Sequence, residues 1–179
     1  MMKTFNIILT TLMLATALSS CMGTKLEETY NRQEQKIDSY INSKGEGYRS
    51  VRNGGANRLV TKEGEGEELE MNGFVSFYYA GYTFNGSFSS SGLFVTNHQQ
   101  TAESAKWNLT DADYQIYEIN LGDARLTQGL KDGLLGVKAG EECEILFSGK
   151  YGFGNETFGM IPANSAQLWK IWVVGVAND

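Results

Sequence analysis

Histidine and cysteine are scarce in this chain of 179 residues, which holds one histidine, His98, and two cysteines, Cys21 and Cys143. A single histidine leaves little room for a histidine-based catalytic triad or a metal site, so we expect no metal ion and no cofactor. His98 lies in a polar stretch, where we expect a solvated side chain. Cys143 lies in the alternating pattern ECEILF and is expected to be a small core residue.

Basic residues are also in the minority, because 15 Lys and Arg stand against 21 Asp and Glu, which gives a formal net charge of −6. An acidic protein repels the phosphate backbone, so this balance argues against nucleic acid as a partner. Hydrophobic residues make up 41% of the chain, which is enough for a real core. The length suits one domain with a short extension.

Long apolar runs are absent except near the N-terminus, where Lys3 precedes the stretch FNIILTTLMLATAL. This stretch is too short to span a bilayer and predicts a secretory signal peptide over residues 1–20. The sequence LSSC, Leu18–Cys21, resembles the bacterial lipobox, which implies cleavage before Cys21 and acylation of that cysteine. The alternative is an ordinary signal peptide with an incidental cysteine. Acylation would tether the protein to a membrane surface and leave Cys143 without a disulfide partner.

Residues 21–47 form a polar segment that we expect to be lipidated and to contain one amphipathic helix. Leu26, Tyr30, Ile37 and Ile41 fall at helical spacings, and the sequence SKGEG then ends the pattern. We expect this helix to pack against the following domain as an arm. A stalk and a dimer contact are the alternatives.

From residue 48 onward the sequence is typical of β-structure. FVSFYYAGYTF, Phe74–Phe84, carries large side chains on both faces and predicts a long central strand. The polar connection HQQTAESAKWNLTDAD is long for a structureless loop, so we expect a functional flap or a short helix in it. Shorter strands are expected in NRLVTK, LFVTN, YQIYEINLG, ECEILFSG and AQLWKIWVVGV.

One internal helix is expected in ARLTQGLKDGLLGVKAGEE, where Leu126, Leu130, Leu134 and Val137 share one apolar face. Several strands with a single internal helix, no nucleotide-binding loop and no repeat predict a small α+β domain over residues 48–179. We expect its sheet to be antiparallel, with the helix packed on one face.

Three groups of residues resemble a known family when they are taken in order and at their distances from one another. They are VSFYYAGYTFNG, then LFVTN, then the run INLGDARLTQGLKDGLLGVKAGEECEILFSGKYGFGNETFGMIPANSAQLWKIWVVGV. Over Leu59–Val176 the chain resembles the FKBP-type peptidyl-prolyl cis-trans isomerases. The resemblance implies an antiparallel, strongly bent β-sheet wrapping one short helix, and proline-containing polypeptides as substrates. The lipobox and the N-terminal helical extension resemble the lipoprotein forms of Gram-negative bacteria.

The resemblance also implies three pocket residues on the strands. Tyr79 matches the family's wall tyrosine, and Trp169 matches the strand aromatic at the back wall. Phe94 matches the pocket phenylalanine that an aspartate follows in the family, and Phe88 is the competing assignment. The alternative for each is an ordinary core residue.

Five more pocket residues are implied at the short helix and in the loop before the last strand. Leu126 and Thr127 match the residues that open the helix, where the Thr127 backbone N–H would bind a substrate carbonyl, and Leu130 takes the floor position. Phe153 stands at the tyrosine of the family's AYG, and Ile161 is the loop residue that would touch the proline ring.

Several positions depart from the family pattern. The aspartate after the pocket phenylalanine is Val95 here, and the tyrosine hydroxyl of AYG is absent at Phe153. Both changes remove polar groups that orient substrate or inhibitor, so we expect an apolar pocket with fewer anchors and weak binding of macrolide inhibitors. Pro162, the only proline, matches the first position of the family's IPP turn, and Ala163 takes the second. Proline fixes φ and stiffens the loop there.

We therefore expect a peptidyl-prolyl cis-trans isomerase that assists protein folding at the cell envelope. The lipid anchor on Cys21 would hold it at the outer membrane, on the periplasmic face or at the cell surface. Fold alone does not guarantee activity, so a catalytically weak or inactive FKBP-like binding or chaperone lipoprotein is the main alternative, which Val95 and Phe153 favour. A surface structural lipoprotein is the third, because the acidic sequence KLEE after Cys21 resembles export signals of some envelope lipoproteins.

Overall fold

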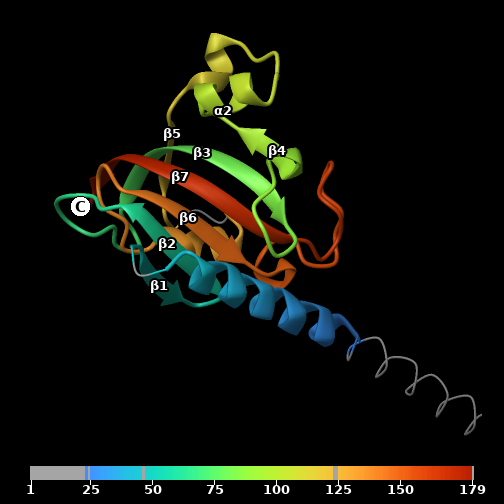
Figure 1. Ribbon diagram of the computed structural model, residues 1–179. Coiled ribbons are helices and arrows are strands. Elements are labelled where there is room, and N and C mark those ends of the chain that lie inside the picture. Colours follow the sequence, from blue (N-terminus) through green and yellow to red (C-terminus); the bar gives the residue numbers. More distant parts are fainter. Residues whose placement is uncertain (1–22, 24, 46, 123–124, 179) are drawn as a thin grey trace, which may run out of the picture. The chain divides into compact units, whose positions relative to one another are not determined.

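The computed structural model describes residues 23, 25–45, 47–122 and 125–178 (Figure 1). The predicted signal peptide and the predicted lipidation site, Cys21, lie outside the described residues. The chain forms two compact units, residues 1–32 and 33–179, and residues 25–32 of the first unit are helical. Within the described part of the chain, no helix is both long and apolar enough to cross a membrane.

The predicted N-terminal helix is confirmed, and it extends over residues 25–43. In the second unit it buries Ile37, Tyr40 and Ile41 against side chains of the sheet. These three residues lie at the i, i+3 and i+4 positions of one helical face. The chain leaves the helix at Gly45, whose φ of +78° glycine adopts without steric cost. Residues 33–43 thus pack on the sheet.

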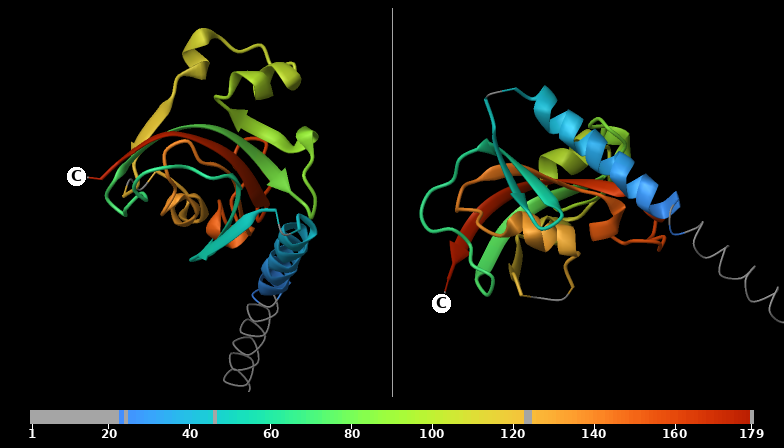
Figure 2. Two further views of the ribbon diagram at one scale, coloured as in Figure 1. Left: turned by 60° about the vertical axis from the view of Figure 1, so that its left-hand side comes forward. Right: turned by 90° about the horizontal axis from the view of Figure 1, so that it is seen from below.

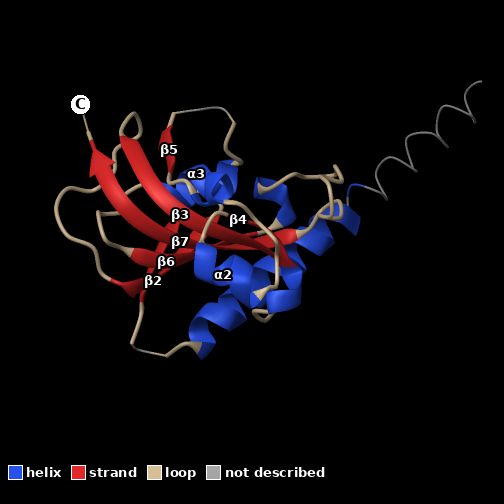
Figure 3. Cartoon of the chain, turned by 90° about the horizontal axis from the view of Figure 1, so that it is seen from above, coloured by secondary structure: helices blue, strands red, loops and turns tan. Residues whose placement is uncertain are grey.

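The seven strands of the described chain are β1 (Arg49–Asn53), β2 (Ala56–Lys62), β3 (Phe74–Phe84), β4 (Leu93–Thr96), β5 (Tyr117–Asn120), β6 (Glu142–Phe147) and β7 (Ala166–Ala177). They form one antiparallel sheet in the order β1-β2-β6-β7-β3-β4, and β5 pairs with the first part of β3 (Figures 1 and 3). The central strand β3 has the bounds predicted from its sequence, and it pairs with β7 along its whole length. Strand β1 was not predicted as a separate element.

The sheet is strongly bent and wraps helix α3 (Gln128–Leu134), as Figure 2 shows for β3 and β7. Successive side chains of a strand point to opposite faces. On β6, Cys143 and Ile145 therefore pack with α3, whereas Leu146 packs with the N-terminal helix. We call the face toward α3 the inner face and the opposite one the outer face. Each face has its own buried hydrophobic cluster, and the prediction that Cys143 is a core residue is confirmed.

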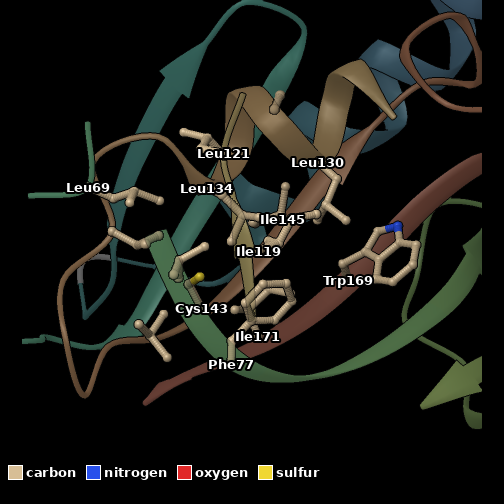
Figure 4. Packing of buried hydrophobic residues seen from close by; sticks show 14 of the residues in the cluster. Leu69, Phe77, Ile119, Leu121, Leu130, Leu134, Cys143, Ile145, Trp169 and Ile171 are labelled. Atoms are coloured by element: carbon tan, nitrogen blue, oxygen red, sulfur yellow. The ribbon is translucent and has the colours of Figure 1, made fainter. Parts of the chain in front are cut away.

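Helix α3 is shorter than its hydrophobic pattern predicted. Leu130 and Leu134 are buried within it and point toward the sheet (Figure 4). Leu126 lies before the helix and Val137 after it, so both join the inner cluster from outside the helix. The helix ends early because Gly136 adopts a φ of +79°, which turns the chain.

Two features hold α3 close to the sheet. A Cβ atom on Gly133 would overlap the side chain of Ile145 on β6, so only glycine permits this approach. Arg58 of β2 donates hydrogen bonds of 2.8–3.1 Å to the carbonyls of Gly133, Leu135 and Gly136. The positive charge of Arg58 also lies at the C-terminal, negative end of the helix dipole, where it stabilises the helix.

The polar connection between β4 and β5 contains a short helix, α2 (Gln99–Ser104), as one of the two predictions for it proposed. The chain also has 3₁₀ helices, η1 (Ser90–Gly92), η2 (Asp111–Tyr114) and η3 (Gly149–Tyr151). The prediction that His98 is solvated is wrong. Its ring stacks on Trp172 with centroids 3.9 Å apart, and burial lowers its pKa. The cause is the strand alternation, which points Trp172 to the outer face beneath α2.

Candidate active site

The inner face carries a cavity of about 480 Å³ at one end of its hydrophobic cluster. This volume lies in the range of pockets that hold small ligands. The lining comes from four strands, from α3, from Leu126 two positions before this helix, and from the loop between η3 and β7. The lining residues are Phe77, Tyr79, Phe94, Val95, Tyr117, Leu126, Leu130, Phe153, Phe158, Gly159, Met160, Ile161 and Trp169.

Trp169 of β7 is the central aromatic residue of this lining, and Figure 4 shows it beside Leu130. Its ring centroid lies 5.9 Å from that of Tyr79 and 5.5 Å from that of Phe94, which stands nearly perpendicular to it at 80°. Tyr79 makes an edge-to-face contact with Tyr117, with centroids 5.9 Å apart. Aromatic pairs prefer such edge-to-face arrangements, so neighbouring rings fix one another. The wall rings of the cavity therefore support one another in this arrangement.

Seven of the eight predicted pocket residues line this cavity: Tyr79, Phe94, Leu126, Leu130, Phe153, Ile161 and Trp169. The competing assignment to Phe88 does not agree with the structure. Phe88 packs against Tyr82 and beneath the ammonium group of Lys170, both on the outer face. The structure thus brings together residues from distant parts of the sequence, and their action on a substrate stays a prediction.

Thr127 is the predicted residue that does not line the cavity. It is the N-cap residue of α3, and its side chain makes no capping hydrogen bond. Its buried Oγ1 atom has no hydrogen-bond partner, and among the described residues no backbone carbonyl accepts from its N–H group. Among the described residues, the donor predicted to bind a substrate carbonyl thus has no backbone acceptor, and it lies next in sequence to the lining residue Leu126.

Few polar atoms reach the cavity, because only Tyr79, Tyr117 and Trp169 among its lining residues carry a side-chain nitrogen or oxygen. The indole N–H of Trp169 donates to Gln167 Oε1 at 2.9 Å, so it is already engaged. Burial, with a smaller contribution from Tyr117, raises the pKa of Tyr79, so its hydroxyl stays protonated at neutral pH. The two tyrosine hydroxyls are thus the side-chain donors of an otherwise apolar lining.

None of the described residues that line the cavity is Asp, Glu, Lys, Arg, His or Cys, so the lining holds no side chain of the types that carry a formal charge or commonly bind metal ions. Across the described residues, no three His, Cys, Asp or Glu side chains are grouped as a metal site requires. The arrangement is suited to enclosing an apolar group and to donating one or two hydrogen bonds to it.

The loop between η3 and β7 forms the rim of the cavity. The rings of Phe153 and Phe158 stack with centroids 4.7 Å apart, and Phe158 and Ile161 exchange backbone hydrogen bonds of 2.9 and 3.0 Å. Phe158 and Met160 are 63% and 75% exposed, although both are large and apolar. Exposed apolar side chains at the mouth of a cavity mark a surface on which another molecule binds.

Sequence reasoning missed Phe77, Tyr117, Phe158, Gly159 and Met160. Tyr117 lies two residues before the buried Ile119 in a predicted strand, so the alternation of side chains could have placed it on the inner face. Phe158 and Met160 lie in an irregular loop, and no periodic pattern indicates which way such side chains point.

A comparison with known families shows that the model described as "FKBP-type peptidyl-prolyl cis-trans isomerase" matches residues 66–174. This range contains every residue that lines the cavity. The N-terminal helix, β1 and β2 precede it.

Two curated fungal proteins are similar in sequence. FK506-binding protein 1 of Aspergillus oryzae is 21% identical over 65% of this chain and 94% of its own length. FK506-binding protein 1A of Neurospora crassa is 33% identical over 37% of this chain and 58% of its own length.

Solved structures show the same fold. FkpA from Escherichia coli superposes with a TM-score of 0.56 at 18% identity, over 96% of this chain and 71% of its own. The three FKBP domains of wheat FKBP73 give a TM-score of 0.58 at 19% identity, over 74% of this chain and 52% of theirs. The predicted fold, a bent antiparallel sheet around one short helix with an N-terminal helical extension, is confirmed.

Proposed function

Because this chain belongs to the family of FKBP-type peptidyl-prolyl cis-trans isomerases, we propose that it catalyses the cis-trans isomerisation of Xaa-Pro bonds in polypeptides. The observation that carries the proposal is the aromatic cavity of the inner face, with Tyr79, Phe94 and Trp169 in its walls. Rotation about such a bond crosses a barrier of ~18–20 kcal/mol and takes tens to hundreds of seconds without a catalyst. No covalent bond breaks, so neither a nucleophile nor a metal ion is needed.

The apolar lining is the source of the rate enhancement. Twisting an amide destroys its resonance and makes it less polar, so an apolar cavity stabilises the twisted amide relative to the planar one. Leu130, Ile161 and Trp169 are each at most 8% exposed and keep water away from the ring of a bound proline. The twisted state is thus favoured by the same side chains that bind the substrate.

A small number of donors orients the substrate in this cavity. The hydroxyl groups of Tyr79 and Tyr117 donate to a substrate carbonyl, as does the backbone N–H of Thr127, for which the described residues offer no backbone acceptor. Val95 and Phe153 supply no polar group at the positions where the family has an aspartate and a tyrosine. The chain therefore depends more on enclosure by apolar groups and less on anchoring than the family pattern implies.

The test is the exchange rate of a short Xaa-Pro peptide, measured by NMR with the parent chain and with Tyr79→Ala. We expect the parent to accelerate exchange and Tyr79→Ala to lose at least tenfold in kcat/KM, because a wall ring and one hydroxyl are removed. Tyr79→Phe should lose less, since it keeps the ring. Tyr78→Ala is the matched control, because Tyr78 directly precedes Tyr79 in β3 and points to the outer face. No acceleration by a folded parent would reject catalysis.

A binding or chaperone function without useful catalysis is the second candidate. The absence of charged anchors from the cavity and the exposure of Phe158 and Met160 favour it. Binding of an unfolded client should then depend on these two rim residues and not on Tyr79 and Trp169. The carboxylate and the tyrosine hydroxyl that Val95 and Phe153 lack can be restored by the double variant Val95→Asp with Phe153→Tyr. If their absence limits catalysis, this variant should raise kcat/KM several-fold.

Inhibitor binding tests the same point. The names of the two fungal relatives state that those proteins bind FK506. We propose that this chain binds such macrolides weakly, because Val95 and Phe153 remove two polar contacts. Tight inhibition of the parent chain would contradict this.

We also propose that the protein acts at the cell envelope, on proline-containing polypeptides, with an acylated Cys21 as its membrane anchor. The support is the sequence LSSC after an apolar stretch preceded by Lys3. Labelled palmitate should be incorporated into the parent but not into Cys21→Ser, and that variant should leave the membrane fraction. A labelled Cys21→Ser variant would reject the assignment.

A further inference from the structure

The loop that forms the rim of the cavity is held at its base by a side chain from the N-terminal helix. The Oε1 atom of Gln33 accepts a hydrogen bond of 2.9 Å from the Gly149 N–H. Its Nε2 atom donates a hydrogen bond of 2.6 Å to the Asn164 carbonyl. One side-chain amide thus joins two backbone groups that lie 15 positions apart in the chain. One of them precedes all the loop residues that line the cavity, and the other follows them.

The two ends of this loop, residues 149–164, also contact each other directly. The Gly149 carbonyl accepts from the Gly154 N–H at 3.0 Å, and the Asn164 N–H donates to the Gly154 carbonyl at 2.6 Å. A Cβ atom on Gly149 would lie 2.5 Å from the Asn164 carbonyl, so the two backbones touch. The loop is therefore closed at its base, and Gln33 bridges the point of closure.

Gln33 is fixed by the sheet on which its helix packs. Ile37 lies one turn further on the same helical face and is fully buried in the outer cluster. Lys36, in the same turn, donates a 2.6 Å hydrogen bond to the Asn85 side chain. The amide of Gln33 is therefore a firm point of attachment for the loop.

We propose that Gln33 is a positioning residue of the isomerase, which holds the rim loop so that Phe153, Phe158 and Ile161 stand correctly against a bound prolyl residue. This inference rests on the proposed function. Through Gln33 the N-terminal helix then helps to position the cavity's rim loop, although the family match begins only at residue 66. The amide of Gln33 is suited to this role because it offers an acceptor and a donor in one plane. Two methylene groups separate the amide from the helix backbone, so it can reach the loop.

The test compares Gln33→Leu, Gln33→Asn and Gln33→Glu in the full chain held in mild detergent. Leucine fills similar space without polar atoms, asparagine keeps the amide but is one methylene shorter, and glutamate keeps only the acceptor at neutral pH. Gln35→Leu is the matched control, because Gln35 lies on the same helix with an exposed side chain. All variants are first shown to unfold cooperatively, and activity is expressed per folded molecule.

Two measurements are made on each variant. Hydrogen exchange of the Gly149 amide should accelerate at least tenfold in Gln33→Leu, remain close to the parent in Gln33→Glu, and not change in Gln35→Leu. For Gln33→Leu and Gln33→Asn we expect kcat/KM for an Xaa-Pro peptide to fall five- to tenfold, mainly through KM, with the affinity for that peptide falling by the same factor. Gln33→Glu should lose an intermediate amount.

The outcomes separate this inference from the proposed function. If the Gly149 amide loses protection while kcat/KM and peptide affinity stay within twofold of the parent, Gln33 is only structural and the inference is overturned. It is also overturned if Gly149 exchange does not change. If the parent binds the peptide without accelerating exchange, the isomerase proposal fails, and the affinity and Gly149 exchange still decide the role of Gln33.

Discussion

The two faces of the sheet carry hollows of similar size, about 480 Å³ on the inner face and about 580 Å³ on the outer face. The inner hollow is lined almost entirely by apolar and aromatic side chains. The outer one lies between β3, β4, β7 and α2, and it mixes aromatic rings with serine, threonine and glutamine side chains and with Lys170. Size alone therefore does not distinguish the candidate active site.

The two hollows differ in what their aromatic rings contact. On the outer face the ring of His98 covers that of Trp172, and the Lys170 ammonium lies 4.1 Å above the ring of Phe88. On the inner face the wall rings of Tyr79, Phe94 and Trp169 meet edge to face or tilted, and the rim rings of Phe153 and Phe158 stack on each other. A cationic and a polar side chain thus already cover two aromatic rings of the outer hollow, whereas the aromatic rings of the inner cavity contact other aromatic rings and can enclose an apolar proline.

The largest expected loss of stability comes from removing the buried interactions of Arg58, which hold α3 against the inner face. Arg58 and its partner Glu141 are 3% and 0% exposed, with Nε and Oε1 3.2 Å apart. Arg58→Met would remove the three helix-end hydrogen bonds and leave the Glu141 carboxylate buried without its closest cation. We expect a loss of about 3–5 kcal/mol in the free energy of unfolding, measured with urea.

The control for Arg58 is Arg52→Met on β1, whose ion pair with Asp38 is exposed. It should change the stability little. A loss below ~1 kcal/mol in Arg58→Met would contradict the idea that this pair anchors α3.

A smaller effect is expected from Gly133→Ala, which tests the close approach of α3 to β6. The added methyl group would overlap Ile145, so α3 should shift and carry Leu130 with it. We expect about 1–3 kcal/mol of destabilisation, although alanine favours helices, and a several-fold fall in kcat/KM. Gly47→Ala should be neutral, since no atom lies within 4 Å of that position. Unchanged stability in Gly133→Ala would show that α3 and β6 can accommodate a methyl group between them.

The outer face should affect stability without affecting the cavity. Tyr40 of the N-terminal helix donates a 2.8 Å hydrogen bond to the buried Glu144 carboxylate. Tyr40→Phe should lower the free energy of unfolding by roughly 1.5 kcal/mol, the usual value for a hydrogen bond to a charged group. The parent value of kcat/KM should be kept, and Tyr48→Phe, at an exposed tyrosine, should change neither quantity. Lower activity in Tyr40→Phe would show that the faces are coupled here.

The smallest expected effect is a pH dependence from His98. Burial lowers its pKa in the folded chain, and only a weaker influence of Glu142 opposes this. As the pH falls below the ordinary histidine pKa of about 6.5, the unfolded chain takes up a proton before the folded chain does, so the folded chain loses stability. The loss should be complete once the pH passes below the folded pKa. Urea unfolding between pH 8 and 5 should show this component in the parent and lack it in His98→Gln, with the remaining pH dependence unchanged.

Much of the fold could be predicted because its signals are local. The run Phe74–Phe84 has large side chains on both faces, and its predicted bounds are those of β3. Tyr79, Phe94 and Trp169 were predicted from motifs and line one cavity. The length of α3 was overestimated, because the leucine spacing continues past Gly136, where the backbone turns.

The contacts that position the site could not be predicted in this way. Gln33 reaches Gly149 and Asn164 across 116 and 131 positions, and Arg58 reaches Gly133 across 75. Each is a polar residue in an ordinary amphipathic segment, and nothing in its neighbours indicates a buried partner. His98 was taken for a solvated residue for the same reason.

The amino-acid sequence by itself determined most of the strands, the approximate helical segments, the family and seven of the thirteen cavity-lining residues, because these depend on local alternation, spacing and motifs. The tertiary structure decided which face of the sheet each alternating set joins, where α3 ends against β6, and which polar side chains meet. The physical reason is that a period of two defines two faces of a strand but not what covers either of them. That choice depends on other segments of the chain, α3 for the inner face of β6 and residues 33–43 for its outer face, whose approach is set by packing and by the pairing of buried polar groups.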